Sequence, residues 1–366
     1  MRSLTARILL IALLASSAVC VVGAERKGVS LDSLMNLPVI GAPVINYSPE
    51  TNWVFGAGVQ GYVLLPEAEK TSVLQLDGAW SLRHQWYINT HANLYIGGRT
   101  PLLLQVNGGY RDYPDIYYGI GNLGNDSTAP LARTGQTYQS QRGYAQVAAL
   151  FQLPQQWAIG PSVDFLHERT SLSAGRCLMW GLGLTAQYDS RDVLYYPTRG
   201  ILFKVGASYY EPLLGNDVRM GRVDTDLRQY VHLGKGCIFT YQLRTQWAIG
   251  QGQIPFQMLP TFGGQDLIRG VPYGMFRDKA MLALQTELRL PIWNFIHACV
   301  FAGIGDVYNT ENWQWTTPKV GYGLGLRLGI NRAKVNIRFD VARSNIYPEW
   351  NSWRSYSFYL TATEAF

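Results

Sequence analysis

One short stretch concentrates the charge that the rest of the chain largely lacks. Residues 263–278 read GGQDLIRGVPYGMFRD, and Asp266, Arg269, Arg277 and Asp278 stand there among glycines and apolar residues, although only 15% of the 366 residues are charged. The stretch has neither helical nor strand periodicity, which indicates a loop. A guanidinium offers a planar fork of donors suited to carboxylates. A solvent-exposed loop does not require an arginine between bulky apolar residues, so the partner of Arg269 is the first question that the sequence raises.

Elsewhere, residue types that catalyse reactions or bind metals are scattered. The segment 56–61, GAGVQG, has the spacing of a dinucleotide-binding turn, but more strand follows it where that motif requires a helix. The histidines and cysteines lack the spacing of metal ligands or of a disulfide framework, and no serine or acid is paired with a positioned base. We therefore predict no enzyme, no metal site and no cofactor, and interpret the cysteines as small apolar residues. The residues concerned are His84, His91, His167, His232, His297, Cys177, Cys237 and Cys299, and the fourth cysteine, Cys20, lies in the N-terminal apolar run.

The N-terminus has the features of a secretory signal. Arg2 and Arg7 precede an apolar run over 8–22, and small residues follow, so we expect a signal peptide at 1–24 and a mature chain that begins near Glu25. Without these two arginines, 29 basic and 25 acidic residues remain, a net charge of +4 spread along the chain. This distribution argues against a nucleic-acid partner.

The composition favours a β-barrel of the bacterial outer membrane. The chain contains 23 Tyr, 11 Trp and 38 Gly, and such barrels use aromatic girdles at both membrane interfaces and small residues where strands bend. No later apolar run reaches the roughly 18 residues of a membrane-spanning helix. A secreted β-sandwich could share this composition, so the periodicity has to decide.

Apolar and polar residues alternate over long segments near the C-terminal end. In 281–290, leucines alternate with Gln285, Glu287 and Arg289, and 320–330 shows a similar period of two. One apolar and one charged face is the pattern of a strand between lipid and a polar lumen. Sandwich strands are shorter, with a mode of about 5–6 residues.

The pattern predicts an all-β fold: a 16-stranded antiparallel transmembrane β-barrel at 37–366, preceded by a short periplasmic segment at 25–36. The asymmetry of short turns and long outer loops is typical of such barrels. The strands are expected at 37–47, 53–65, 72–81, 86–96, 102–111, 141–153, 157–170, 178–189, 200–211, 221–232, 237–249, 281–290, 295–306, 320–330, 334–344 and 356–366. The expected short turns are 153–156, 234–236, 291–294 and 331–333, and the expected long loops are 112–140, 250–280, 307–319 and 345–355.

The opening stretch resembles a known family. Its frame is similar to the sixth extracellular loop of the BamA/TamA-type outer-membrane barrel superfamily, the bacterial surface antigen barrel. The residues that carry this resemblance are Gly263, Gly264, Arg269, Gly270, Tyr273, Phe276, Arg277 and Asp278. Further similar segments are 188–200, Glu287-x-Arg289-x-Pro291 and 325–340, so the resemblance covers most of 180–366. The last strand resembles the family's C-terminal signal through Tyr356, Phe358, Leu360 and Phe366.

The resemblance implies that the loop folds into the lumen, where its arginine binds carboxylates of the inner wall. Glu287 matches the acid on the family's twelfth strand, and the alternation also places it on the polar face, so we predict an Arg269–Glu287 ion pair. The family's second acid falls at Gly303, and Asp306 has the opposite parity, so the second partner stays unidentified. Tyr273 is the candidate for the aromatic residue that the family has directly after Arg-Gly.

The function that the resemblance implies is insertion or translocation of polypeptides at the outer membrane, through a weak seam between the first and last strands. Pro38 and Pro43 lie in the expected first strand and lack the N–H that a ladder needs, which suits an edge strand. The segment 25–36 is too short for periplasmic POTRA-like domains, so a member without them is expected.

The expected partners are outer-membrane lipid and lipopolysaccharide, with unfolded outer-membrane proteins or other assembly components as clients. Two other functions stay open. One is a loop-plugged channel for small solutes, and the other is a structural surface barrel that binds partners through its long loops at 112–140 and 250–280.

Overall fold

The computed structural model describes residues 39–48, 52–68, 70–122, 134–172, 175–193, 196–250, 252–293, 295–329, 336–347 and 355–361. The expected signal peptide, the segment 25–36, the turn at 331–333 and Phe366 lie outside the described residues. The regular elements in the described ranges are strands, apart from two short 3-10 helices, η1 (Pro154–Gln156) and η2 (Pro212–Leu214). No helix in these ranges is long and apolar enough to cross a membrane.

Within the described ranges, sixteen strands form one antiparallel sheet in the order β1 to β11 and then β14 to β18. The antiparallel all-β architecture expected from the sequence is confirmed. The strands are β1 (Val39–Ser48), β2 (Asn52–Val63), β3 (Ser72–Ser81), β4 (Trp86–Ile96), β5 (Leu102–Tyr117), β6 (Gln136–Gln152), β7 (Trp157–Thr170), β8 (Arg176–Asp189), β9 (Gly200–Tyr210), β10 (Met220–Gly234), β11 (Cys237–Gly250), β14 (Ala280–Trp293), β15 (Ile296–Tyr308), β16 (Lys319–Gly329), β17 (Asn336–Ser344) and β18 (Tyr356–Thr361). A separate small sheet pairs β12 (Thr261–Phe262) with β13 (Phe276–Arg277).

Exposure along the strands is inverted relative to a soluble protein. Leu324 on β16 is 63% exposed, whereas Arg327 on the same strand is fully buried. On β17, Phe339 is 42% exposed between Arg338 and Asp340, which are both fully buried. Because successive side chains of a strand point to opposite faces, the sheet has an apolar outer face and a charged inner face.

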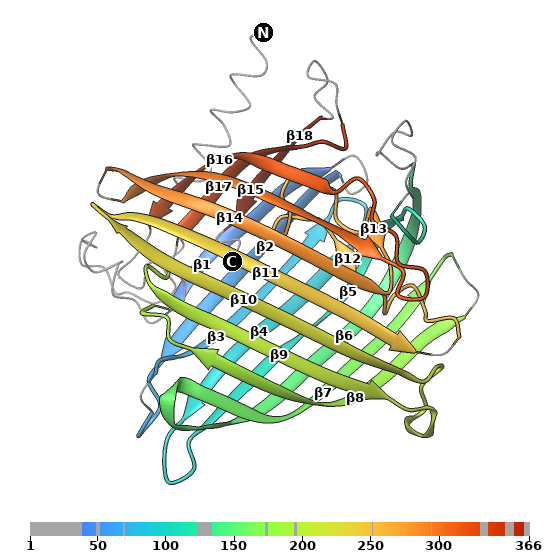
Figure 1. Cartoon of the computed structure of the whole chain (residues 1–366), viewed down its shortest axis with the longest axis horizontal. Helices are drawn as coiled ribbons and strands as arrows, with labels where there is room; N and C mark the ends of the chain where they lie inside the picture. The colour runs from blue at the N-terminus through green and yellow to red at the C-terminus, as the bar shows by residue number, and fades with distance from the viewer. Residues whose placement is uncertain are drawn as a thin grey trace.

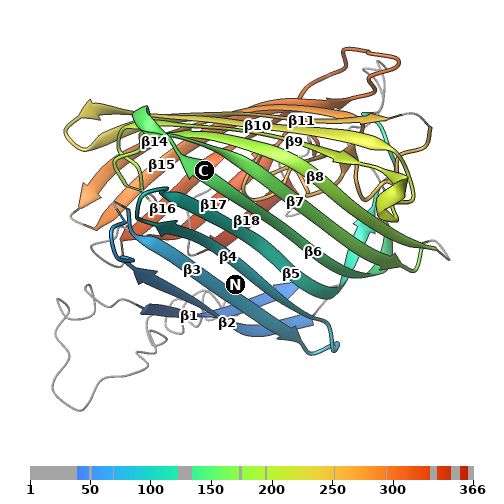
Figure 2. The ribbon, with the colours of Figure 1, turned by 90° about the horizontal axis from the view of Figure 1, so that it is seen from below.

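The sheet bends round its charged face. In Figure 1, β9 to β11 pass in front of β1 to β6, and the view in Figure 2 also separates these two walls. Hydrogen bonds cross the concave side: Lys204 Nζ donates to Gln105 Oε1 over 3.0 Å, and Gln105 Nε2 donates to Gln187 Oε1 over 3.1 Å. Asn122, just after β5, donates to the carbonyl of Val307 on β15 over 2.8 Å. The polar residues therefore face a shared interior.

Several expected loop boundaries are wrong. The loop expected at 112–140 is shorter, because β5 and β6 stay paired up to Tyr117 and Gln136. The turn expected at 291–294 lies mostly within β14, which continues after a register shift. The bounds expected for the loop at 250–280 agree with the end of β11 and the start of β14, but the loop also contains the β12–β13 pair. In these places backbone pairing continues where the simple alternation of side chains ends.

Loop 252–279 joins β11 to β14 and folds onto the concave face of the sheet. Its β12 and β13 lie inside the curve of the sheet in Figure 1. The loop has an apolar core of its own against β14, β15 and the end of β17, which should contribute stability roughly in proportion to the buried area. The buried residues of this core are Phe262, Leu267, Ile268, Val271, Met275, Phe276, Met281, Ala283, Val307 and Ile346.

Candidate functional site

The tip of loop 252–279 places Arg269 deep in the interior. The preceding Ile268 packs in the loop's apolar core and is 1% exposed, and the following Gly270 adopts a left-handed backbone with φ of +95°. A Cβ at Gly270 would lie 2.6 Å from the carbonyl carbon of Arg343. Only glycine therefore combines this backbone with so close an approach to β17. The sharp turn directs the side chain of Arg269 toward the wall.

Arg269 binds two carboxylates at once. Its Nη2 donates to Glu287 Oε2 on β14 and its Nη1 donates to Asp340 Oδ2 on β17, each over 2.7 Å. Arg269 is 2% exposed, and its guanidinium carbon lies 3.5 Å from the ring centroid of Phe301. Burial alone would lower the pKa of Arg269, but the charges of Glu287 and Asp340 outweigh burial and raise it. The side chain is thus held as a cation.

The wall contributes three further arginines to this cluster. Arg327 donates from Nη2 to Glu287 Oε2 over 3.0 Å and from Nη1 to Asp340 Oδ1 over 2.5 Å. Arg289 Nε donates to Glu287 Oε1 over 2.7 Å, and Arg338 Nε lies 3.5 Å from Asp340 Oδ2. Each of the two carboxylates therefore contacts three guanidinium groups. We call these six residues, Arg269, Glu287, Arg289, Arg327, Arg338 and Asp340, the ion cluster.

Backbone contacts tie the same loop tip to the last two strands. The N–H of Gly270 donates to the hydroxyl of Tyr359 on β18 over 3.0 Å. The hydroxyl of Ser344 on β17 donates to the carbonyl of Gly270 over 2.8 Å. Together with Arg269, these contacts connect the loop tip to β14, β17 and β18. The position of the loop is therefore linked to the strand at the end of the sheet.

Sequence reasoning found one carboxylate and missed the other. The structure brings together Arg269, Glu287 and Arg289, which the sequence singled out. Asp340 is the second acid, and its place on the polar face of the alternating segment 334–342 was the available signal. Gly303 carries no acid, and a Cβ there would lie 2.6 Å from Ile268 Cδ1. The loop's own apolar side chain thus occupies the space over that glycine.

The other predicted loop residues lie elsewhere in the loop. Arg277, on β13, donates from Nη1 to the carbonyl of Phe256 over 3.2 Å, and its backbone forms a bridge to Gly121. Asp278 is buried and accepts a hydrogen bond from the N–H of Lys279 over 2.8 Å. Tyr273 is 53% exposed. The aromatic ring that packs on Arg269 belongs to Phe301. Tyr273, the candidate from the sequence, lines a cavity instead. Of the remaining loop residues, Gly263 and Gly264 line the same cavity and Phe276 belongs to the apolar core.

The predicted C-terminal residues lie on β18 as far as the structure describes them. Phe358 and Leu360 are more than half exposed on the outer face, and Tyr356 is half-buried. Phe366 lies outside the described ranges.

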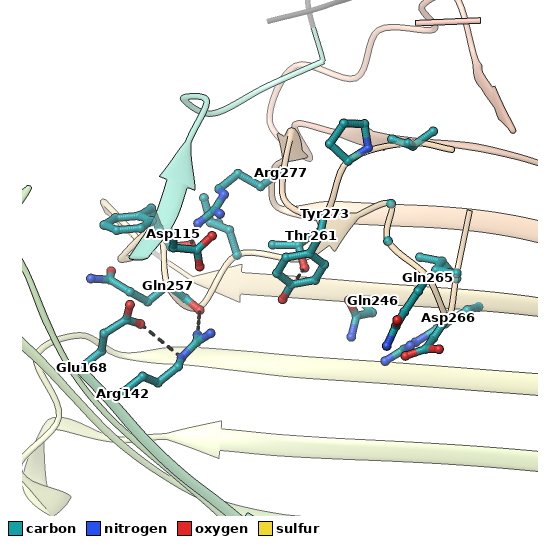
Figure 3. Close-up of a pocket in the computed structure, with 18 of the residues that line it drawn as sticks. Asp115, Arg142, Glu168, Gln246, Gln257, Thr261, Gln265, Asp266, Tyr273 and Arg277 are labelled. Atoms are coloured by element: carbon teal, nitrogen blue, oxygen red, sulfur yellow. Dashed lines mark hydrogen bonds and ion pairs between the residues drawn. The ribbon is translucent and has the colours of Figure 1, made fainter. Parts of the chain in front are cut away.

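A polar cavity of about 700 Å³ lies between loop 252–279 and the facing wall of the sheet. Figure 3 shows Arg142, Glu168, Asp266, Tyr273 and Arg277 around it. Within the described ranges, no group of histidine, cysteine, aspartate and glutamate residues has the arrangement of a metal site. The arrangement can hold a loop by ion pairing and can enclose a small polar molecule.

Comparisons with known proteins point to one family. A model of the Omp85 superfamily domain matches residues 109–366. The structure of BamA from Haemophilus ducreyi lacking POTRA domains 1–3 is 15% identical with a TM-score of 0.56, over 88% of this chain and 68% of that chain. CdiB from Acinetobacter baumannii is 10% identical with a TM-score of 0.53, over 87% of this chain and 58% of that chain. A comparison with curated proteins gave no match. At these identities the two structures share the fold.

Proposed function

The chain belongs to the Omp85 superfamily, and on this premise we propose that it forms a closed barrel in the outer membrane and helps to insert or translocate polypeptides there. The family is located in the outer membrane and is non-enzymatic. BamA and CdiB, whose fold it shares, are protein assembly and translocation barrels. Outer-membrane lipid and lipopolysaccharide are then its surroundings, and unfolded outer-membrane proteins or other assembly components are its proposed clients.

The distribution of apolar side chains supports the membrane setting. Large apolar residues are exposed on nearly every strand of the sheet, for example Leu184 (63%) and Leu324 (63%), while inner-face charges such as Arg327 are fully buried. In water, so much exposed apolar surface would favour aggregation. Facing lipid, the same surface needs no cover, and the charged inner face then borders a polar lumen.

The anchoring of the loop tip at the last strands is the observation that carries the proposal. Arg269 binds acids of β14 and β17, and Gly270 binds Tyr359 of β18. In the hydrogen-bonded order of the sheet, β18 and β1 are the two ends. We propose that these ends meet at a weak seam, and that the loop tip holds the β18 side of it in place.

An open seam would offer β18 as a template for another strand. Edge strands present unpaired N–H and C=O groups, and polypeptides bind to them by strand addition. On the other side of the seam, β1 contains Pro43, which pairs opposite Ala57 of β2 and has no N–H to donate. Proline is confined to edge strands and bulges of sheets. Both ends of the sheet thus suit reversible pairing.

A loop-plugged channel for small solutes is the second candidate. The polar cavity beside loop 252–279 favours it, because a solute could enter there if the loop moved. In this function the loop tip would act as a gate in the lumen and β18 would never receive a client strand. The two functions therefore differ in whether a polypeptide contacts β18.

Site-specific photocrosslinking tests the proposed function. A photoreactive residue at Leu360 on β18 is expected to crosslink to an unfolded outer-membrane protein supplied during its assembly. The same residue at Leu184 serves as the control, because that position is similarly exposed but lies on β8, in the middle of the sheet. Crosslinks at Leu360 alone support strand addition. Equal yields at both positions, or no client at Leu360 under saturating supply, would contradict it.

A further inference from the structure

The cavity beside loop 252–279 has the size of a small-molecule site. Its volume of about 700 Å³ lies within the roughly 300–1,000 Å³ of ligand pockets. Its wall combines strand residues with loop residues that are far apart in the sequence, and the close-up in Figure 3 shows their side chains converging from both sides. None of the six residues of the ion cluster lines it. The cavity is therefore distinct from the ion cluster, although Tyr359, which accepts the hydrogen bond from Gly270, lines it.

The acids that line this cavity are already paired. Asp115 binds Arg111 at 2.9 Å and Glu168 binds Arg142 at 3.2 Å. Asp266 lies 3.3 Å from the guanidinium of Arg338. Arg111, Arg142 and Arg338 thus neutralise the negative charges of these acids, and neither Arg244 nor Arg277 takes part.

Two cations of the lining form no ion pair and no hydrogen bond with a carboxylate in the part of the chain that the structure describes. Arg244, on β11, forms no hydrogen bond or ion pair with the described residues, and its cross-strand neighbour Asp226 binds Arg228 instead. Arg277 donates to a backbone carbonyl and lies 5.2 Å from the ring centroid of Phe256, but within the described ranges it forms no ion pair. Two such guanidinium groups on one cavity give it a local excess of positive charge.

We propose that this cavity binds a small, water-soluble organic anion, with Arg244 and Arg277 as its cationic contacts. Unpaired guanidinium groups are suited to phosphate or carboxylate oxygens, which they bind with two parallel hydrogen bonds. Rings of Tyr138, Phe256 and Tyr273 line the same space, and they provide flat surfaces for the body of the ligand. A sugar phosphate has both parts and fits the volume.

Calorimetric titration of the full chain in detergent micelles tests this site, with glucose 6-phosphate, inorganic phosphate and glucose as the probes. Glucose 6-phosphate is expected to bind most tightly, and its affinity should fall as salt is raised. Arg244→Gln should weaken this binding by roughly tenfold to a hundredfold, the range that corresponds to one charge-assisted hydrogen bond. Arg219→Gln is the matched control, because Arg219 pairs with Glu211 on the surface and should bind like the parent.

A second variant keeps the proposal testable if Arg244→Gln does not fold, which heat-modifiable gel migration would reveal. Gln265→Glu changes an exposed loop residue of the lining and adds a negative charge, so it should also weaken the binding of glucose 6-phosphate. The proposal is overturned if glucose binds as tightly as its phosphate, or if the parent protein binds no anion. It is also overturned if the folded variants bind glucose 6-phosphate like the parent.

Discussion

The ion cluster predicts an asymmetry between two substitutions that break the same ion pair. Arg269→Met removes the loop's cation but leaves Glu287 and Asp340 each in contact with wall arginines. Glu287→Gln removes one of the two acids of the ion cluster and leaves three guanidinium groups without that counter-charge. Although both variants remove the Arg269–Glu287 contact, we expect Glu287→Gln to lower the free energy of unfolding more.

The magnitudes follow from what each change leaves buried. Arg269→Met loses two charge-assisted hydrogen bonds of 2.7 Å, but no carboxylate is left alone and the methionine can still pack on Phe301. We expect a loss of about 1.5–3 kcal/mol, at the level of one such bond, because wall arginines still bind both carboxylates. Glu287→Gln leaves uncompensated charge in fully buried surroundings, for which about 3–5 kcal/mol is typical.

Equilibrium unfolding in urea measures both losses. The chain and its variants would be refolded into lipid vesicles and titrated, with tryptophan fluorescence and heat-modifiable gel migration as independent probes of the folded fraction. Linear extrapolation then gives the free energy of unfolding. Arg219→Met is the control for removing an arginine, because its ion pair with Glu211 is on the surface, where solvent screening leaves such pairs with little effect on stability.

One result would refute this reasoning. If Arg269→Met destabilised the protein as much as Glu287→Gln, the wall arginines would not be neutralising the acids once the loop cation is gone. The double variant gives a second check. It should be less destabilised than the sum of the two single changes, because the methionine removes one of the three cations that Glu287→Gln strands.

Two further predictions concern the loops at either end of the strands. Gly270→Ala should displace the loop tip, because its Cβ would lie 2.6 Å from the carbonyl carbon of Arg343. We therefore expect the variant to have a higher single-channel conductance than the parent in planar bilayers. An unchanged conductance would show that the tip does not obstruct the lumen. At the turn after β8, burial alone would raise the pKa of Asp192, but hydrogen bonds from Thr198 and from backbone N–H groups lower it. Its stabilising contribution is therefore present above the ordinary carboxyl pKa of about 3.9 and is lost as pH falls through the lower folded-state value. In the parent, the backbone amides of the turn should lose protection against hydrogen exchange as the pH falls through that window. Asp192→Asn should remove this pH dependence.

The centres of the strands could be predicted from the sequence because their side chains have only two directions. Once Leu284 is assigned to the outer face, Gln285 and Glu287 must point inward, and the structure has Leu284 40% exposed and both polar residues almost fully buried. The ends of β5 and β6 could not be predicted in this way. There Tyr117 still pairs with Gln136, but this pairing is made by backbone hydrogen bonds. Such bonds form with any side chain, so the sequence shows no apolar alternation that would reveal them.

The partners within the site were harder to predict than the strands. Asp340 lies 71 residues from Arg269 in the chain, and their contact depends on how far the loop reaches across the sheet. The alternation on β17 gives the direction of Asp340, but the depth at which the loop ends depends on packing such as that of Ile268 over Gly303. The cavity was missed for the same reason, because Arg244 and Arg277 come from different elements and neither belongs to a local motif.

The composition of the ion cluster bears on how the loop could be released. An arginine that alone neutralised Glu287 and Asp340 could leave only by exposing two buried charges, and release would then threaten the wall itself. Here Arg289, Arg327 and Arg338 already contact the same carboxylates, so the wall stays neutralised when Arg269 departs. The main obstacle to release is then the apolar core around Phe262 and Phe276, which is non-directional and tolerates small displacements better than ion pairs do. A small displacement of the tip within that core would free Gly270 from Tyr359 and with it β18 at the proposed seam. The proposed function requires this kind of local and reversible change.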